Sequence, residues 1–300
     1  MHMVWIWLAL ATASGETIRD LCLRSLLKRS SWTILQVIGL SSALAAFLLL
    51  PLALSQQQSI IWPDFLLAIS LGGGLNALAF WNYGRAIAKE DLSLVLPLIN
   101  LSPLVLLLSG WLVLGERPEL SAILGVALLV TGALLLADHS QQARFSLNGL
   151  REIWASAGCR AMLLVALLWG IAASIDKLGI EASNSFVWGM SLQGLIATSL
   201  LSLDLKRSNS PASRTLRPTS GSAALTLLLA ACAGAAGTVM QMEAIQQTEV
   251  VNVVAIKRLS TLFGSGVGVF ALGEPNALGR LTAASLMVLG AVTVMLGSLN

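Results

Sequence analysis

The sequence predicts an all-α integral membrane protein with ten transmembrane helices, built as two inverted five-helix repeats. Three observations lead to this fold class. The composition is too apolar for a water-soluble domain. Ten apolar segments have about the length that crosses a bilayer. The second half of the chain also repeats the first half at a constant offset.

The composition identifies lipid as the solvent. Hydrophobic residues make up 56% of the 300 residues, charged residues only 11%, and the mean hydropathy is +0.81. Soluble domains carry about 25% charged residues. Because a bilayer core holds no water to satisfy backbone polar groups, segments that cross it have to be helices. The basic residues are scattered rather than gathered on one face, so we expect no nucleic-acid partner.

The ten apolar segments follow one another along the whole chain. No Lys or Arg precedes the first segment, so we expect a retained helix there and not a signal peptide. We expect a first five-helix repeat over 1–137, a connecting loop over 138–160 and a second repeat over 161–300. The segments span 4–20, 33–54, 64–86, 92–114, 119–137, 161–180, 184–203, 223–245, 249–272 and 277–298.

The internal repeat is the strongest signal. A shift of 158 residues lays Leu114-Gly115-Glu116 on Leu272-Gly273-Glu274. Each half has five helices, an odd number, so the second half enters the membrane from the opposite side. Inverted repeats of this kind support alternating access around a site near the midplane. Without a gap, the same shift pairs Ala86-Ile87 with Ala244-Ile245, Leu101-Ser102 with Leu259-Ser260, and Gly132-Ala133 with Gly290-Ala291.

The positive residues predict the orientation. Fourteen of them fall on one side of the ten segments, whereas only Arg117 and Lys177 fall on the other. By the positive-inside rule the first side is cytoplasmic, which puts both termini outside the cell membrane. The residues assigned to the cytoplasmic side are Arg19, Arg24, Lys28, Arg29, Arg85, Lys89, Arg144, Arg151, Arg160, Lys206, Arg207, Arg214, Arg217 and Arg280.

Lys257 and Arg258 are the leading candidates for a functional site. They lie eight or nine residues into the ninth segment, about 12–14 Å deep at roughly 1.5 Å per residue. A charge at that depth costs at least about 2.5–3.5 kcal/mol. Thr261 continues the same polar stripe. The pair forms either an anion site for a carboxylate or phosphate, or a structural ion pair or a side chain that reaches the surface.

The repeat places Asn100 at the position equivalent to Arg258. Pro97 and Pro103 flank Asn100 and weaken the backbone hydrogen bonds of the fourth segment. Interrupted helices at corresponding positions of two halves point to a transporter binding site.

Glu16 and Asp176 are candidate counter-charges on the first and sixth segments. Glu16 lies as deep as Arg258, so it either pairs with Arg258 or acts as a proton-coupling carboxylate. Asp176 is nearer the membrane interface, where a pair with the adjacent Lys177 is expected.

Further polar and aromatic side chains interrupt the apolar segments. Polar groups in lipid need partners, so these side chains either line a substrate pathway or hold helices together. The candidates are Asn76, Asn82, Tyr83, Trp169, Gln241 and Asn252.

The sequence lacks the residue patterns of the common membrane enzymes. Its two histidines, His2 and His139, fall at an end and in a loop, so we expect no catalytic residue, metal site or cofactor. Cys22, Cys159 and Cys232 have no metal-ligand spacing and are expected to be apolar fillers.

The sequence resembles the EamA-like members of the drug/metabolite transporter superfamily. The resemblance is carried by LVLGERPELSAILGVALLVTGALLL (112–136), FALGEPNALGRLTAASLMVLGAVTVML (270–296), EDLSLVLPLINLSPL (90–104), TEVVNVVAIKRLSTLF (248–263) and LLWGIAASIDKLG (167–179). It implies ten helices and secondary transport of small metabolites, often export of amino acids or drugs. It also implies that Glu116 and Glu274 anchor loops, and that both termini are cytoplasmic, which is opposite to the charge bias.

We therefore expect a secondary transporter for a small metabolite, such as an amino acid or another anionic or amphiphilic compound. A coupling proton or an exchanged solute would accompany the substrate, and the lipid bilayer is the other partner. The alternative function is a non-transporting membrane scaffold or an enzyme.

Overall fold

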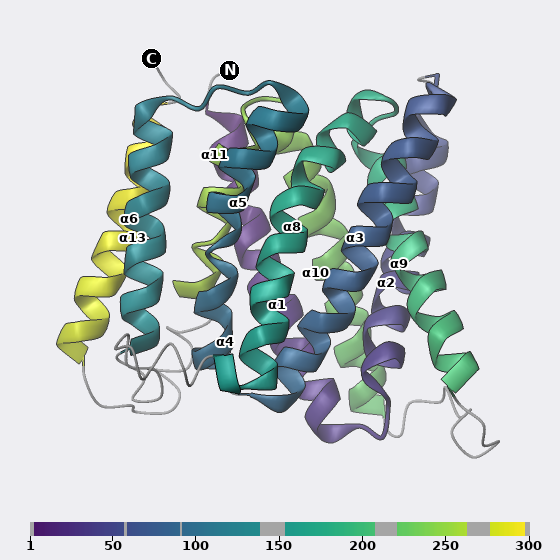
Figure 1. The fold of residues 1–300 in the computed structure, drawn as a ribbon. Coiled ribbons are helices and arrows are strands. Elements are labelled where there is room, and N and C mark those ends of the chain that lie inside the picture. The colour runs from purple at the N-terminus through teal and green to yellow at the C-terminus, as the bar shows by residue number, and fades with distance from the viewer. Residues whose placement is uncertain are drawn as a thin grey trace.

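The computed structural model describes residues 3–56, 59–90, 92–138, 154–207, 221–262 and 277–297. All regular secondary structure in these ranges is helical, and the helices form one upright bundle (Figure 1). In chain order they are α1 (Val4–Arg29), α2 (Ile34–Leu54), α3 (Trp62–Lys89), α4 (Leu92–Ile99), α5 (Ser102–Ser109), the π-helix η1 (Gly110–Leu114), α6 (Leu120–Asp138), α8 (Ala157–Glu181), α9 (Ser185–Arg207), α10 (Gly221–Ile245), α11 (Val250–Lys257) and α13 (Ala277–Gly297).

Several of these helices can cross a bilayer, so the chain is a multi-pass membrane protein. Two further apolar helices, Leu120–Leu135 and Thr282–Gly297, are shorter, and α1 carries Glu16, Arg19 and Asp20. Among the described residues, six stretches are long and apolar enough by length and composition: Ile34–Leu54, Trp62–Lys89, Val95–Leu114, Ala157–Glu181, Ser185–Arg207 and Gly221–Ile245.

The first helix is longer than the sequence predicted. It was expected to end near residue 20, but α1 continues to Arg29. Residues 21–29 are mostly good helix formers, and Lys28 and Arg29 in the last turn stabilise the negative end of the helix dipole. As a result, residues that were assigned to the first loop lie inside the bundle.

Each half of the chain packs mainly against the other half. α1 contacts α10, α3 contacts α8, α2 contacts α9, and α6 contacts α13 (Figure 1). The offset of 158 residues exchanges the first of these pairs with the second, and it exchanges the two members within each of the others. The described helices are therefore arranged with an approximate two-fold relation between the halves.

Equivalent helices of the two halves run in opposite directions. The amide of Ile61, before α3, donates to the carbonyl of Ala182, after α8, at 2.9 Å. The end of α8 thus lies at the face where α3 begins, whereas the end of α1 lies at the other face, where α2 begins (Figure 1).

Two helices are interrupted at equivalent positions. The fourth segment was predicted as one span, but it divides into α4 and α5 at residues 100–101. Pro103 has no N–H, so it cannot donate to the carbonyl of Ile99 in a continuous helix. In the second half α11 ends at Lys257, and residues 258–259 form a turn. Residues 263–272 of the predicted ninth segment, which include Gly264, Ser265 and Gly268, lie outside the described residues, as does Glu274.

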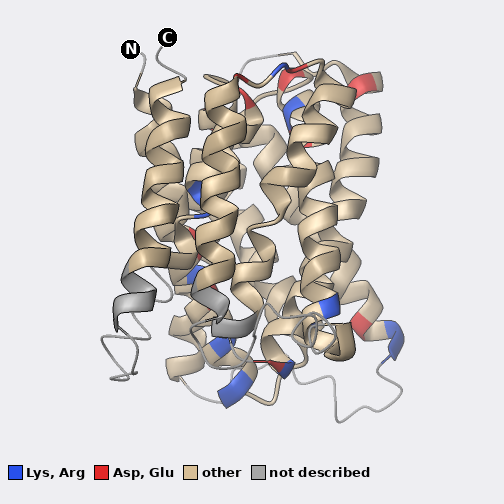
Figure 2. Ribbon diagram, turned by 60° about the vertical axis from the view of Figure 1, so that its left-hand side comes forward, with Lys and Arg blue, Asp and Glu red and all other residues tan. Residues whose placement is uncertain are grey.

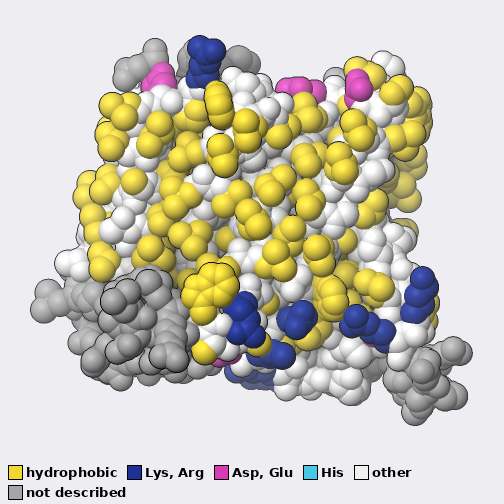
Figure 3. Space-filling view, in the orientation of Figure 1, with side chains coloured by type: hydrophobic (Ala, Val, Ile, Leu, Met, Phe, Trp, Pro, Cys, Tyr) yellow, Lys and Arg dark blue, Asp and Glu magenta, His cyan; other side chains and the backbone are white. Residues whose placement is uncertain are grey.

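The surface has a wide apolar belt between two polar ends (Figure 3). On α3, Leu66, Leu67 and Leu71 are 53%, 63% and 53% exposed, as lipid-facing side chains would be. In the view of Figure 3, most of the Lys and Arg lie at the end opposite to the start of α1, and most of the visible Asp and Glu lie at the other end. Figure 2 shows that further charged residues lie at mid-height inside the bundle.

Candidate functional site

The two interrupted helices meet at their interruptions. The side-chain amide of Asn100 donates to the Thr261 hydroxyl at 3.0 Å, across the boundary between the two halves. Arg258 Nε donates to the Ser102 hydroxyl at 3.0 Å in the same region. Asn100 and Arg258 are equivalent in the repeat, and both are buried. The interruptions of the two helices therefore face each other inside the bundle.

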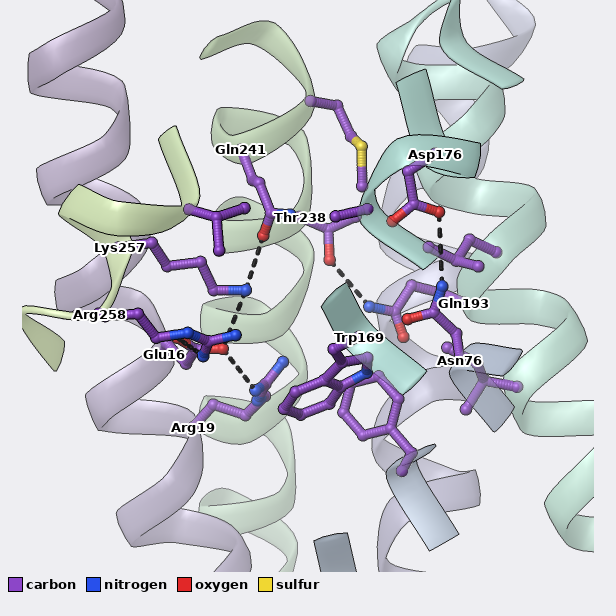
Figure 4. Close-up of a pocket in the computed structure, with 16 residues that line it drawn as sticks. Glu16, Arg19, Asn76, Trp169, Asp176, Gln193, Thr238, Gln241, Lys257 and Arg258 are labelled. Carbon is purple, nitrogen blue, oxygen red and sulfur yellow. Dashed lines mark hydrogen bonds and ion pairs between the residues drawn. The ribbon is translucent and has the colours of Figure 1, made fainter. Parts of the chain in front are cut away.

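Glu16 forms the centre of a buried ion cluster. Its carboxylate lies 3.1 Å from Lys257 Nζ, 3.3 Å from Arg19 Nη2 and 4.0 Å from Arg258 Nη1 (Figure 4). Lys257 Nζ also donates to Gln241 Oε1 at 2.8 Å. Burial of these charges is costly, and their mutual attraction offsets that cost only while the partners stay together.

Arg19 belongs to this cluster and not to a loop. The sequence assigned it to the cytoplasmic side, and that assignment was wrong because α1 extends to Arg29. Arg19 also lies 3.5 Å from Asp20, and its guanidinium stacks 5.2 Å from the ring centroid of Phe80.

The opposite wall of the site is polar and acidic. Asp176 Oδ1 accepts from the Asn76 side chain at 3.4 Å, and Gln193 donates to the Thr238 hydroxyl at 2.9 Å (Figure 4). The sequence predicted that Asp176 pairs with Lys177. Neighbouring residues of a helix do not face each other, and Lys177 pairs with Glu116 at 2.8 Å instead. The side chain of Asp176 is thereby left facing the cavity.

The two walls enclose a cavity of about 60 Å³. One water molecule needs roughly 10–15 Å³ on this measure, so the cavity has room for several. Trp169 lies at its side, and its ring centroid is 6.0 Å from both Lys257 Nζ and Arg258 Cζ. The ring packs against Phe80, with 5.1 Å between the two ring centroids. The cavity thus combines an aromatic surface, cations on one wall and a carboxylate on the other (Figure 4).

Comparison with known proteins gives the family. The family model described as the EamA-like transporter family matches residues 3–137 and again residues 156–296. This chain belongs to the EamA-like transporter family. The sequence resemblance is therefore confirmed, including its two repeats, and membership indicates a membrane transporter.

Solved structures support the fold of this EamA-like protein. One of them, titled "Crystal structure of protein", is 15% identical with a TM-score of 0.71, and the match covers 99% of this chain and 98% of the other. At that identity the likeness concerns the fold alone. A search of curated proteins gave no match.

Most of the candidates predicted in this EamA-like chain lie around the cavity. Tyr83 and Thr261 line a smaller adjoining cavity, which shares Glu16, Trp169 and Arg258 with the first. Asn100 lies behind them and bonds to Thr261. The predicted residues that line the main cavity are Glu16, Asn76, Trp169, Asp176, Gln241, Lys257 and Arg258.

Two predicted site residues lie elsewhere. Asn82 donates to the carbonyl of Leu78 at 2.9 Å and accepts from Arg85 at 3.4 Å, so it stabilises its own helix. Asn252 donates to the Thr248 hydroxyl at 3.0 Å, near the start of α11. Both side chains bond within their own segment, and neither lines the two cavities.

The sequence missed five polar or charged residues of this region. Arg19, Gln193 and Thr238 line the cavity, and Asp20 and Ser260 line the smaller one. Gln193 and Thr238 could have been identified from the sequence, because each is a polar residue inside an apolar segment. Arg19 lies at the end of the predicted first segment, and nothing in the sequence indicated that it faces inward.

The charges of the cavity favour an anionic group at one wall. At the wall that holds Glu16, three cations (Arg19, Lys257 and Arg258) face two carboxylates (Glu16 and Asp20), which leaves one positive charge in excess at that wall, and Asp176 on the opposite wall brings the total to zero. In the part of the chain that is described, no three His, Cys, Asp or Glu residues are grouped as a metal site would require.

Proposed function

We propose that this protein is a secondary transporter that moves a small, carboxylate-bearing metabolite across the cell membrane by alternating access. The observation that carries the proposal is the buried ion cluster at the point where the two interrupted helices meet. Charged groups inside a membrane bundle typically mark a substrate or ion pathway.

The proposed architecture has ten transmembrane helices in two inverted repeats. The spans are α1, α2, α3, the α4–α5–η1 unit, α6, α8, α9, α10, the segment that starts with α11, and α13. The opposite directions of α1 and α8 support this proposal. The polar residues in the middle of α1 are compatible with a span because they face the cavity and not the lipid.

The two walls of the cavity suggest how a substrate binds. A carboxylate would compete with Glu16 for Lys257 and Arg258, which are its present partners. The second wall offers the Asp176 carboxylate to a hydrogen-bond donor such as an ammonium group. A zwitterionic amino acid would satisfy both walls, and release of Glu16 would leave a carboxylate that can take up a coupling proton.

Flux measurements in proteoliposomes test the proposal. We expect saturable uptake or exchange of at least one compound from a panel of amino acids and small carboxylates. Replacement of Lys257 by Met removes a hydrogen bond to a charged group, worth about 1.5–3 kcal/mol, and should weaken apparent affinity about ten- to hundredfold. Lys89→Met, on the polar end of α3, is the control and should leave affinity unchanged.

Two results would overturn this function. One is the absence of saturable flux for the whole panel from protein that is folded and inserted. The other is wild-type affinity in both Lys257→Met and Arg258→Met. The first result would favour the scaffold or enzyme alternative, and the second would place the site elsewhere.

A further inference from the structure

We propose that Glu116 closes the cavity toward the face where α1 begins, through a latch that joins the first half of the chain to α8 and α11. We use the name latch for Glu116, Lys177 and the backbone amide of Val250. The proposal extends the transport function, and it is carried by a second cluster of contacts outside the cavity.

The glycines around Glu116 fix the position of its carboxylate. Gly115 has a φ of +69°, a left-handed conformation that turns the chain sharply after η1. The amide of Glu116 then donates back to the carbonyl of Gly110 at 3.2 Å. A Cβ on Gly110 would lie 3.2 Å from Glu116 Oε2, so the absence of a side chain there leaves room for the carboxylate.

The Glu116 carboxylate holds two elements of the second half at once. Glu116 Oε1 accepts from Lys177 Nζ near the end of α8 at 2.8 Å. The same oxygen accepts from the amide of Val250 at the start of α11 at 3.3 Å. A carboxylate at a helix N-terminus is favoured by the helix dipole. With one oxygen, a loop of the first half thus holds α8 and α11 together.

The latch lies between the cavity and the face where α1 begins. Asp176, the neighbour of Lys177, lines the cavity, as does Val254, one helical turn below Val250. One turn of α-helix is about 5.4 Å long. A solute that enters the cavity between α8 and α11 from this face would have to pass the latch.

The latch is well suited to open and close. The side chains of Lys177 and Glu116 are 22% and 9% exposed, so the pair is screened from solvent yet within reach of it. Lys177 is the more exposed partner, so water can solvate its ammonium group when the pair separates, and opening does not require unfolding. Separation of η1 from α8 and α11 would expose the cavity.

Thiol labelling tests the latch without a known substrate. In a protein whose native Cys22, Cys159 and Cys232 are replaced by Ser, Thr238→Cys reports on access to the cavity. A membrane-impermeant maleimide is applied to intact cells and to inverted vesicles, and Arg117→Cys identifies the face that carries the latch. From that face, Glu116→Gln and Lys177→Met should each raise the labelling rate of Thr238→Cys by about tenfold.

A neighbouring carboxylate provides the matched control. Glu119 lies in the same loop and bonds to Ser121, so Glu119→Gln should label within twofold of the parent. A disulfide between Glu116→Cys and Lys177→Cys, formed by mild oxidation that leaves the unpaired thiol of Thr238→Cys free, should slow labelling of Thr238→Cys from that face. The latch would be overturned if Thr238→Cys were labelled in the Glu116→Gln protein at the rate of the parent and the cross-link had no effect.

The outcome is separable from the transport proposal. Latch variants that speed labelling in a protein without measurable flux would retain the latch and reject transport. Saturable flux with unchanged labelling in Glu116→Gln and Lys177→Met would retain transport and reject the latch.

Discussion

Glu16 determines the electrostatics of the cavity because it is shared by cations from two helices. Lys257 is the last residue of α11 and Arg258 follows it, whereas Arg19 lies one turn along α1 from Glu16. Removal of one partner from a buried ionic cluster leaves uncompensated charges, which costs more than the cluster itself contributes. The cluster is consequently sensitive to single substitutions.

Glu16→Gln is therefore expected to lower the free energy of unfolding by about 3–5 kcal/mol. Thermal unfolding in detergent measures the change. Lys257→Met in the same chain should restore part of the loss, because it removes one of the unpaired cations. Glu181→Gln, an exposed carboxylate at the end of α8, serves as the control and should change little. An additive effect of Glu16→Gln and Lys257→Met would contradict the pairing.

Asp176 is expected to select substrates and not to stabilise the fold. Asp176→Asn keeps the size and the hydrogen-bonding capacity but removes the negative charge on the second wall. We expect about tenfold weaker apparent affinity for a transported amino acid and little change for a carboxylate of the same length without the amine. Competition experiments in proteoliposomes measure both. Equal losses for the two compounds would contradict the proposed wall.

At the scale of elements, the crossing of α6 and α13 shows how the repeat is built into the packing. A Cβ on Gly132 would lie 2.7 Å from the carbonyl of Ala283, and one on Gly290 would lie 2.5 Å from the carbonyl of Gly125. Gly132 and Gly290 are equivalent under the offset of 158 residues. Small residues let membrane helices approach closely, so both glycines are required by the same contact.

Gly290→Ala should accordingly destabilise the protein by about 1–3 kcal/mol through overpacking. Gly74→Ala is the matched control, because a Cβ at Gly74 meets nothing within 4 Å. Alanine is the better helix former, so Gly74→Ala should be neutral or stabilise by about 0.5–1 kcal/mol. Unfolding in detergent distinguishes the two, and equal effects would contradict the packing argument.

At the scale of the whole molecule, the charge distribution predicts which face is cytoplasmic. Most of the Lys and Arg in view lie at the end opposite to the start of α1 (Figure 3), which by the positive-inside rule is the cytoplasmic end. The latch and both ends of the described chain would then face outward. The family resemblance implies the reverse orientation, so a direct measurement decides.

Cysteine labelling on intact cells checks the orientation. In a background without native cysteines, we expect Arg117→Cys to react with an impermeant maleimide and Lys89→Cys to react only after permeabilisation. Both side chains are exposed at opposite ends of the bundle. The reverse pattern would place the termini in the cytoplasm.

The sequence alone determined the membrane class, the family and the two repeats. The apolar composition follows from exposure to lipid, and the spacing of the doubled motif follows directly from the order of the residues. It also found Lys257, Arg258 and Glu16, since charges in apolar segments are conspicuous. Boundaries were less accurate: residues after position 20 are polar enough to resemble a loop, although helix formers carry α1 to Arg29.

Only the tertiary structure decided which polar side chains face one another. Asn82 and Asn76 look alike in the sequence, and both donate to a carbonyl of their own helix, but Asn76 also reaches Asp176 on α8. Arg19 joined the cavity and Lys177 paired with Glu116 for the same reason. The direction of a side chain depends on the rotation of its helix against helices from the other half, and packing between distant segments sets that rotation.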